Sequence, residues 1–144
     1  MRLFLLIITG ICATTVSAGS LRANSQSSRI LPSTDFWTAF DNIQDTMVWP
    51  TPNSTASLIS STFGARIRAS CNCYDFHRGI DIHGEIGDRV VASYGGKVKR
   101  VMTYSTGNKI VVLEHSFANG VNFHGHTITK WYTHYFHLDK QLVI

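Results

Sequence analysis

Two side chains that could bind a metal, His77 and Asp81, lie close together in the segment His77-Arg78-Gly79-Ile80-Asp81. Imidazole and carboxylate groups are common zinc ligands, and a catalytic zinc usually takes three protein ligands and leaves its fourth position to water. On an extended segment both side chains project to the same side, and Gly79 adds no bulk between them. A pair with this spacing is also common on protein surfaces. We predict that His77 and Asp81 are two of three zinc ligands, and the surrounding sequence has to support this.

The segments around this pair have the composition of β-strands separated by glycine-containing turns. Strands are expected at 58–62, 89–93, 97–104, 109–115 and 128–138. The polar stretch Ser105-Thr106-Gly107-Asn108 between two of them is typical of a hairpin turn. Several short strands with such turns predict a mostly β, antiparallel domain over residues 57–144.

The first eighteen residues have the pattern of an export signal. Arg2 precedes an apolar run, and Val16-Ser17-Ala18 is a small-x-small site of the kind that signal peptidase cuts. A membrane anchor is the alternative, but the apolar run is shorter than the roughly 20 residues that a spanning helix needs. We therefore predict a signal peptide at residues 1–18 and a secreted, extracellular protein without stable membrane insertion.

Residues 19–56 are expected to form a leader and a short packing segment. The leader, residues 19–35, is rich in serine and other polar residues and has little to bury. Apolar residues then recur at helical intervals (Phe36, Trp37, Phe40, Ile43 and Met47), which predicts a short helix. The prolines of Trp49-Pro50-Thr51-Pro52 should end it.

Composition fits one globular domain. The chain has 144 residues, of which 44% are hydrophobic and 15% charged, and its formal net charge is +4. The basic residues are scattered except for Lys97, Lys99 and Arg100. We interpret this cluster as a solvated strand edge and expect no nucleic-acid binding.

Two cysteines remain after the predicted signal, Cys71 and Cys73. An oxidising compartment favours a disulfide, although a bridge across one residue closes a small, strained ring. Pairing within the chain and pairing with another chain both stay open, and a zinc site from these two thiols is the weaker alternative. Asn53-Ser54-Thr55 is a glycosylation sequon if the host exports through an endoplasmic reticulum.

Five motifs follow one another in a characteristic order. They are Phe63-Gly64-Ala65-Arg66, His77-Arg78-Gly79-Ile80-Asp81, Gly87-Asp88-Arg89-Val90-Val91-Ala92 with Gly95-Gly96-Lys97-Val98, Gly107-Asn108 leading to His115, and Tyr135-Phe136-His137-Leu138. This order resembles the lysostaphin-type or LytM-type zinc endopeptidases, which cut peptidoglycan cross-bridges. The resemblance covers residues 57–138.

The resemblance implies a fold and a set of roles. The fold would be the antiparallel sheet core of that peptidase family, incomplete at its C-terminus. His77 and Asp81 would bind zinc, and His137 would be the catalytic histidine that hydrogen-bonds the metal-bound water or the developing oxyanion. The substrate would be a peptide of peptidoglycan cross-bridges.

One part of the family pattern is missing. The family carries a His-x-His pair after Tyr-x-His-Leu, which supplies the third zinc ligand and a second catalytic histidine, whereas no histidine follows His137 here. His124-Gly125-His126 is a His-x-His sequence, but it precedes His137. We interpret it as a solvated hairpin loop.

The remaining histidines are assigned other roles. His83 is expected in solvent or at a cleft wall, and His115 at the end of a strand. His134 differs in parity from His137 and is expected on the opposite face of the strand.

Two functions stay open. The first is a secreted zinc metalloendopeptidase domain whose sequence is incomplete. The second is a catalytically inactive relative that binds cell wall or protein. A plain secreted β domain would leave the five ordered motifs unexplained. A sheet without its last strands would have an unpaired edge, so residues 19–144 alone are expected to be marginally folded.

Overall fold

The computed structural model describes residues 2–8, 35–52 and 58–143, and the side chains from residue 35 onward. In this part of the chain one helix, α1 (Phe36–Gln44), accompanies eight strands. These are β1 (Arg2–Ile8), β2 (Ile59–Ser61), β3 (Gly64–Arg68), β4 (Cys73–His77), β5 (Ile80–His83), β6 (Lys97–Thr103), β7 (Lys109–Phe123) and β8 (His126–Leu138).

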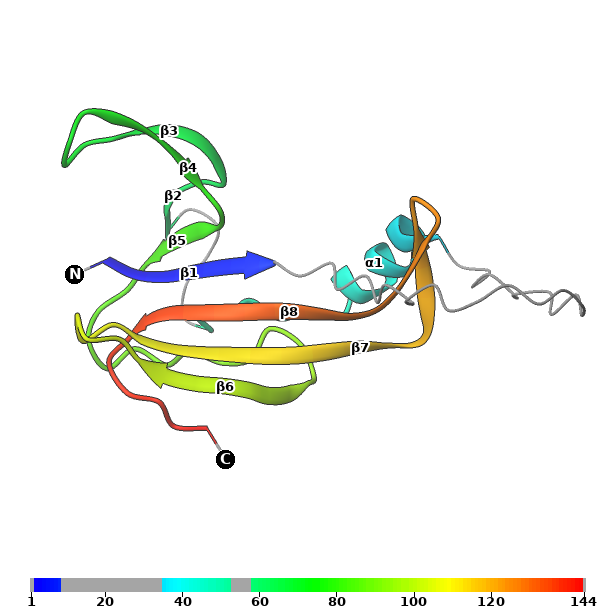
Figure 1. Cartoon of the computed structure of the whole chain (residues 1–144). Helices are drawn as coiled ribbons and strands as arrows, with labels where there is room; N and C mark the ends of the chain where they lie inside the picture. Colours follow the sequence, from blue (N-terminus) through cyan, green and yellow to red (C-terminus); the bar gives the residue numbers. More distant parts are fainter. Residues whose placement is uncertain (1, 9–34, 53–57, 144) are drawn as a thin grey trace, which may run out of the picture.

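Six of these strands form one sheet in the order β2-β5-β1-β8-β7-β6, and β3 and β4 form a separate hairpin (Figure 1). Every neighbouring pair is antiparallel. The prediction of a mostly β, antiparallel domain is therefore confirmed.

Strand β1 lies inside the sheet, between β5 and β8 (Figure 1). Its Leu6 pairs with Ile80 on one side and with Tyr135 on the other. This strand belongs to the segment predicted as an export signal, so the full-length chain uses part of that segment as a structural element. The expected cleavage position, Ala18, lies outside the described residues, as does the sequon at Asn53. The signal peptide stays a prediction.

The β6–β7 hairpin confirms the turn expected at residues 105–108. The backbone N–H of Gly107 donates to the carbonyl of Tyr104 at 2.8 Å, and Gly107 has φ 81°. A positive φ of this size favours glycine. The strand after this turn runs to Phe123, well beyond the predicted end at His115, because its second half has a helix to pack against.

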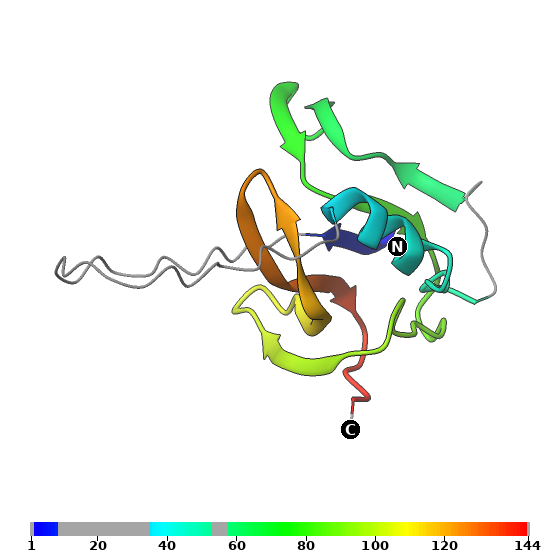
Figure 2. The ribbon, with the colours of Figure 1, turned by 90° about the vertical axis from the view of Figure 1, so that its right-hand side faces the viewer.

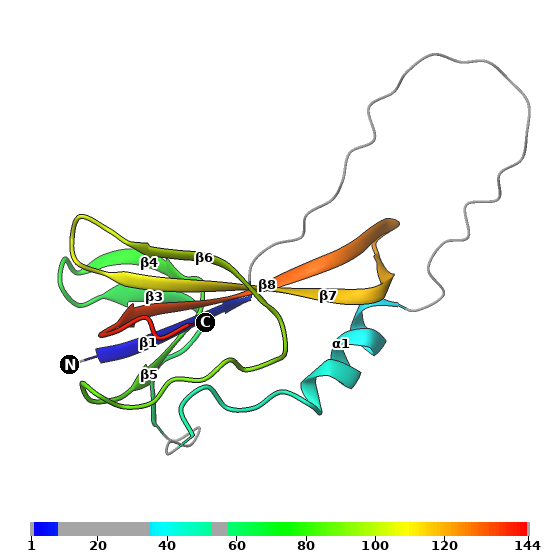
Figure 3. The same cartoon turned by 90° about the horizontal axis from the view of Figure 1, so that it is seen from below.

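That packing involves α1, which begins at the predicted Phe36. The side chain of Asp35 caps the helix by accepting from the Trp37 N–H at 3.0 Å. Figures 2 and 3 show α1 beside the outer part of the β7–β8 hairpin. The apolar cluster there contains Ile43, Phe117, Val121, Ile128 and Trp131. No helix in the described residues is long and apolar enough to cross a membrane.

The prediction of a strand at residues 89–93 is wrong. The segment instead runs beside residues 48–50, where the Val48 N–H donates to the Ser93 carbonyl and the Val91 N–H donates to the Pro50 carbonyl, both at 2.8 Å. Proline has no N–H to return, so a regular ladder cannot form at this point. Val90 and Val91 are half-buried, so the apolar composition of 89–93 reflects a loop that packs against the core.

Candidate functional site

His77 and Asp81 meet where the hairpin joins the sheet. Strand β4 ends at His77, the chain bends at Gly79, and β5 begins at Ile80. The two residues therefore do not share one extended segment, and that part of the prediction is wrong. Their side chains nevertheless meet, since Nε2 of His77 lies 3.4 Å from Oδ1 of Asp81.

The ring of His77 has a defined tautomer. The ring is buried, and its Nδ1 lies 2.8 Å from the carbonyl oxygen of Thr62. A carbonyl only accepts, so Nδ1 must carry the proton and donate, with Ser61 Oγ at 3.2 Å as a second neighbour. In the neutral ring Nε2 then keeps a lone pair, and this lone pair faces Asp81. Metal-binding histidines typically donate their other ring N–H to a carbonyl or carboxylate in this way.

Arg66 holds the other side of the Asp81 carboxylate. Its guanidinium lies 3.6 Å from Oδ2 of Asp81 and 3.2 Å from the carboxylate of Asp75, and it donates to Ser61 Oγ at 2.8 Å. Hydrogen bonds from Arg68, and then Arg66, hold the pKa of the Asp75 carboxyl below its usual value. Arg66 is thus fixed by several partners, and it leaves Oδ1 of Asp81 directed at His77.

The gap between His77 and Asp81 fits a shared cation. Two lone pairs that face each other at 3.4 Å repel unless a metal ion or a proton lies between them. When two ligand atoms bind one tetrahedral zinc at the usual bond lengths, they lie about 3.3 Å from each other. The donor set therefore fits two positions of a zinc site. Within residues 2–8, 35–52 and 58–143 no group of three His, Cys, Asp or Glu side chains could hold a metal.

His137 lies apart from this pair. It is exposed near the end of β8 with φ 59°, and its backbone N–H donates to Oδ1 of Asn108 at 2.9 Å. Strand β1 separates β8 from β5, which carries Asp81. The structure thus brings together two of the three predicted site residues, and the third lies two strands away.

His134 was not predicted as a site residue, yet it shares a face of the sheet with Asp81. Asp81 pairs with position 5 of β1 and His134 with position 7. Paired residues point to the same face, and so do positions two apart in one strand. Burial, and then the positive charge of Arg100, lower the pKa of His134. The odd spacing of His134 and His137 along β8 is visible in the sequence. Only the cross-strand register shows which of the two shares a face of the sheet with Asp81.

The other histidines lie away from the His77–Asp81 pair. His83 is exposed, with Nε2 3.5 Å from Glu85 Oε1. His124 occupies the exposed tip of the β7–β8 hairpin, in agreement with the predicted loop, whereas His126 is exposed but is the first residue of β8.

His115 corrects a prediction, because it lies buried within β7 and does not end a strand. Its Nδ1 donates to the Gly95 carbonyl at 2.8 Å, and its Nε2 accepts from the Thr133 hydroxyl at 2.9 Å. Its ring stacks on Trp131 with centroids 4.1 Å apart. It is a core residue with both nitrogens satisfied.

Buried histidines give the fold a pH dependence. Burial lowers the pKa of His115, despite the opposing effect of its hydrogen bond to the Gly95 carbonyl, and burial also lowers the pKa of His134. Below about pH 6.5 the unfolded chain gains protons that the folded chain does not, so we expect the free energy of unfolding to fall as the pH drops from 7 toward 5. Urea titrations across this range measure it, and His134→Gln should reduce the slope. A constant free energy of unfolding would contradict the prediction.

Glu114 affects the stability of the fold in a separate, more acidic pH range. Hydrogen bonds from Lys130, Tyr132 and Lys99 lower its pKa to about 2. Its contribution to stability is therefore complete above its usual pKa near 4.5 and is lost as the pH falls toward 2. The loss of stability caused by the histidines and the loss caused by Glu114 therefore occur at different pH values and can be measured separately.

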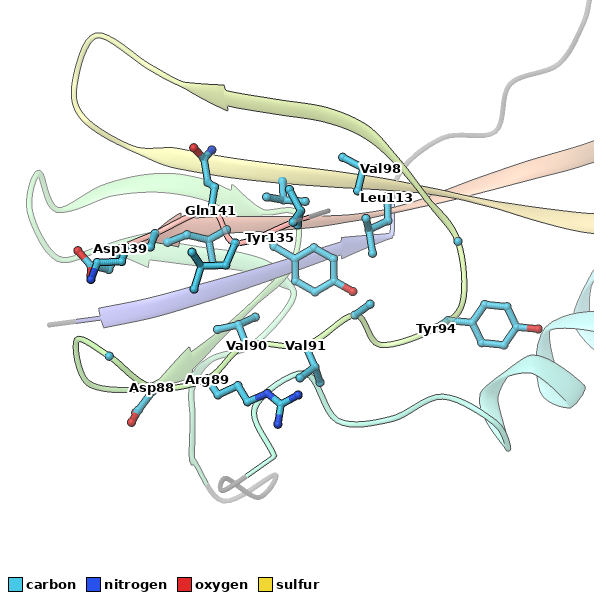
Figure 4. A pocket seen from close by; sticks show the side chains of 18 of the residues that line it. Asp88, Arg89, Val90, Val91, Tyr94, Val98, Leu113, Tyr135, Asp139 and Gln141 are labelled. Carbon is cyan, nitrogen blue, oxygen red and sulfur yellow. The ribbon is translucent and has the colours of Figure 1, made fainter.

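A pocket of about 920 Å³ opens on the other face of the sheet (Figure 4). Figure 4 shows Tyr135 directed from the sheet toward the loop that carries Val90 and Val91. The Tyr135 hydroxyl accepts from the Ser93 N–H at 2.8 Å, which ties this loop to the sheet. His77, Asp81 and His137 do not line the pocket. It adjoins the apolar core and shares no residue with the His77–Asp81 pair.

No protein-family model, curated protein or solved structure matches the chain.

Proposed function

We propose that this chain is a zinc-dependent metalloendopeptidase domain in which His77 and Asp81 bind the metal. One observation carries the proposal: Nε2 of His77 faces Asp81 Oδ1 at 3.4 Å, while Nδ1 is committed to the Thr62 carbonyl. The resemblance of the ordered motifs to the lysostaphin-type or LytM-type enzymes supports the same conclusion. It further suggests an exported enzyme that cuts peptide bonds in peptidoglycan cross-bridges.

The surrounding residues prepare this pair for a metal. The Thr62 carbonyl and Ser61 orient the imidazole, and Arg66 orients the carboxylate. When bound, zinc would polarise a peptide carbonyl and acidify water. These neighbours fix the positions of the two ligands before any metal arrives, which reduces the ordering cost of binding.

Proton transfer is assigned to histidines of β8. The resemblance gives this role to His137, which is exposed at the end of its strand. His134 is a second candidate, because it shares a face with Asp81 and its lowered pKa keeps it neutral near pH 7. A neutral imidazole can accept a proton there. Replacing each in turn by Gln, and comparing the pH profile of peptide hydrolysis, separates the two.

Metal content tests the zinc site. We expect the full-length chain to bind more zinc than His77→Ala at equal free zinc, because the substitution removes one of the two ligands in the pair. His83→Ala is the matched control, since His83 is a neighbouring histidine that is exposed and paired with Glu85. Plasma emission spectrometry gives the stoichiometry. Equal zinc in parent and His77→Ala would refute the assignment.

A non-catalytic binding module is the second candidate. It is favoured by the finding that the described residues supply two ligands and no third. In that case the chain would sediment with purified peptidoglycan, His77→Ala would bind equally well, and no glycine-rich cross-bridge peptide would be cut. Cleavage of such a peptide that chelators stop and zinc restores would favour the enzyme.

A further inference from the structure

The two cysteines form a disulfide at the tip of the β3–β4 hairpin. Cys71 lies in the turn and Cys73 is the first residue of β4, and both are exposed. The hairpin stands away from the six-stranded sheet (Figures 1 and 2). A thiol from solution can therefore reach the bridge without any movement of the core.

This disulfide does not join the two strands of the hairpin. The last cross-strand pair is Arg68 with Cys73, so Cys71 lies in the turn that joins these two residues, and the bridge to Cys73 encloses Asn72 alone. The stabilisation that a disulfide gives through the unfolded chain grows with the length of the loop it closes. A loop that encloses one residue gives the smallest such stabilisation, so the bridge is a minor contribution to holding the hairpin together.

Other contacts hold the hairpin. Five consecutive pairs run from Gly64–His77 to Arg68–Cys73. The guanidinium groups of Arg66 and Arg68 lie 3.2 and 2.9 Å from the Asp75 carboxylate. The disulfide can therefore be reduced while the β3–β4 hairpin stays folded.

The ring favours its own opening. Asn72 has φ 48°, a left-handed conformation that residues other than glycine adopt at a cost, although asparagine tolerates it better than most. Reduction releases this residue from the small ring. Exposed or constrained disulfides are the ones that exchange readily, whereas structural disulfides resist reduction.

We propose that Cys71–Cys73 is a thiol–disulfide exchange site whose substrates are accessible thiols. A thiolate attacks one sulfur of the bridge, the sulfur–sulfur bond breaks, and its electron pair leaves on the other cysteine, which takes up a proton. A second thiolate attacks the substrate sulfur of this mixed disulfide and releases the second cysteine. Two substrate thiols are thereby oxidised to one disulfide, and the protein gains two electrons as a Cys71, Cys73 dithiol.

The experiment uses the full-length chain and about 1 mM reduced glutathione under nitrogen. We expect one molar equivalent of glutathione disulfide per chain, and peptide mapping by mass spectrometry should find Cys71 and Cys73 both newly alkylatable, counted separately from Cys12. The initial rate should be at least about tenfold higher than that of a small linear disulfide with the same thiol. Cys71→Ser and Cys73→Ser cannot close the ring and should yield no such product.

Thermal melting of the reduced chain is the second readout. A midpoint within about 3 °C of the oxidised chain is expected, because the hairpin keeps its pairs and its ion pairs. Resistance of the bridge to glutathione, or unfolding on reduction, would overturn the proposal. Both outcomes are independent of zinc content and of peptide hydrolysis.

Discussion

A full-length chain with proline in place of Leu6 is expected to lose about 3 kcal/mol or more of its free energy of unfolding. Leu6 pairs with Ile80 on one side and Tyr135 on the other, so it lies in the interior of the sheet. Proline there removes a backbone donor, and its ring obstructs the neighbouring strand. Chemical denaturation followed by tryptophan fluorescence measures the loss.

Leu6→Val is the matched control. Valine keeps the N–H and has a high β propensity, so this variant should stay within about 1.5 kcal/mol of the parent. If proline and valine variants unfold at the same denaturant concentration as the parent, residues 2–8 are not part of the folded sheet. The comparison therefore decides between a strand and a segment that is only an export signal.

Removal of residues 1–18 deletes β1 from the sheet. Without β1 the sheet is divided into β2–β5 and β8-β7-β6, and both β5 and β8 have an unpaired edge. The sequence predicted marginal folding for residues 19–144 because of a missing last strand, whereas the structure gives a second reason, the loss of an interior strand. A cooperative melt of that shorter chain at the parent's midpoint would contradict both.

The position of β1 also bears on the proposed chemistry. It separates the strand of Asp81 from the strand of His134 and His137. A chain that keeps residues 2–8 in the sheet holds these histidines away from the His77–Asp81 pair. A chain that loses the segment on export frees the edges of both strands. Zinc content and hydrolysis should therefore be measured before and after removal of residues 1–18.

The sequence was sufficient for local features and for the class of the fold. The spacing of Phe36, Phe40 and Ile43 predicted α1, and the turn at Gly107 predicted the β6–β7 hairpin, because both signals depend only on near neighbours. It also located the two residues that meet, His77 and Asp81.

Pairing between distant segments was not predictable. The run that became β1 has the composition of an export signal, and nothing local shows that it pairs with β5 and β8. Without that register His134 could not be assigned to the face of Asp81. Likewise, the loop at 89–93 reads as a strand until its neighbour is seen to contain Pro50.

Trp131→Ala is expected to cost about 3–5 kcal/mol of the free energy of unfolding. Trp131 is 4% exposed and lies in the apolar cluster between α1 and the β7–β8 hairpin. Its ring stacks on His115 and packs at an angle against Tyr94. Alanine leaves a cavity that these rings cannot close without moving α1, so the helix should loosen with the hairpin. Urea denaturation followed by far-ultraviolet circular dichroism measures the loss.

Trp131→Phe separates ring packing from hydrogen bonding. Among the described residues the buried Nε1 of Trp131 has no hydrogen-bond partner, and such a donor costs about 1–3 kcal/mol. Phenylalanine removes this donor and keeps an aromatic ring against His115, so the smaller ring and the relieved donor should nearly cancel. A loss as large as that of alanine would mean that Nε1 has a partner in the folded protein. A small loss would show that the contribution of Trp131 comes from ring packing and not from a hydrogen bond of Nε1.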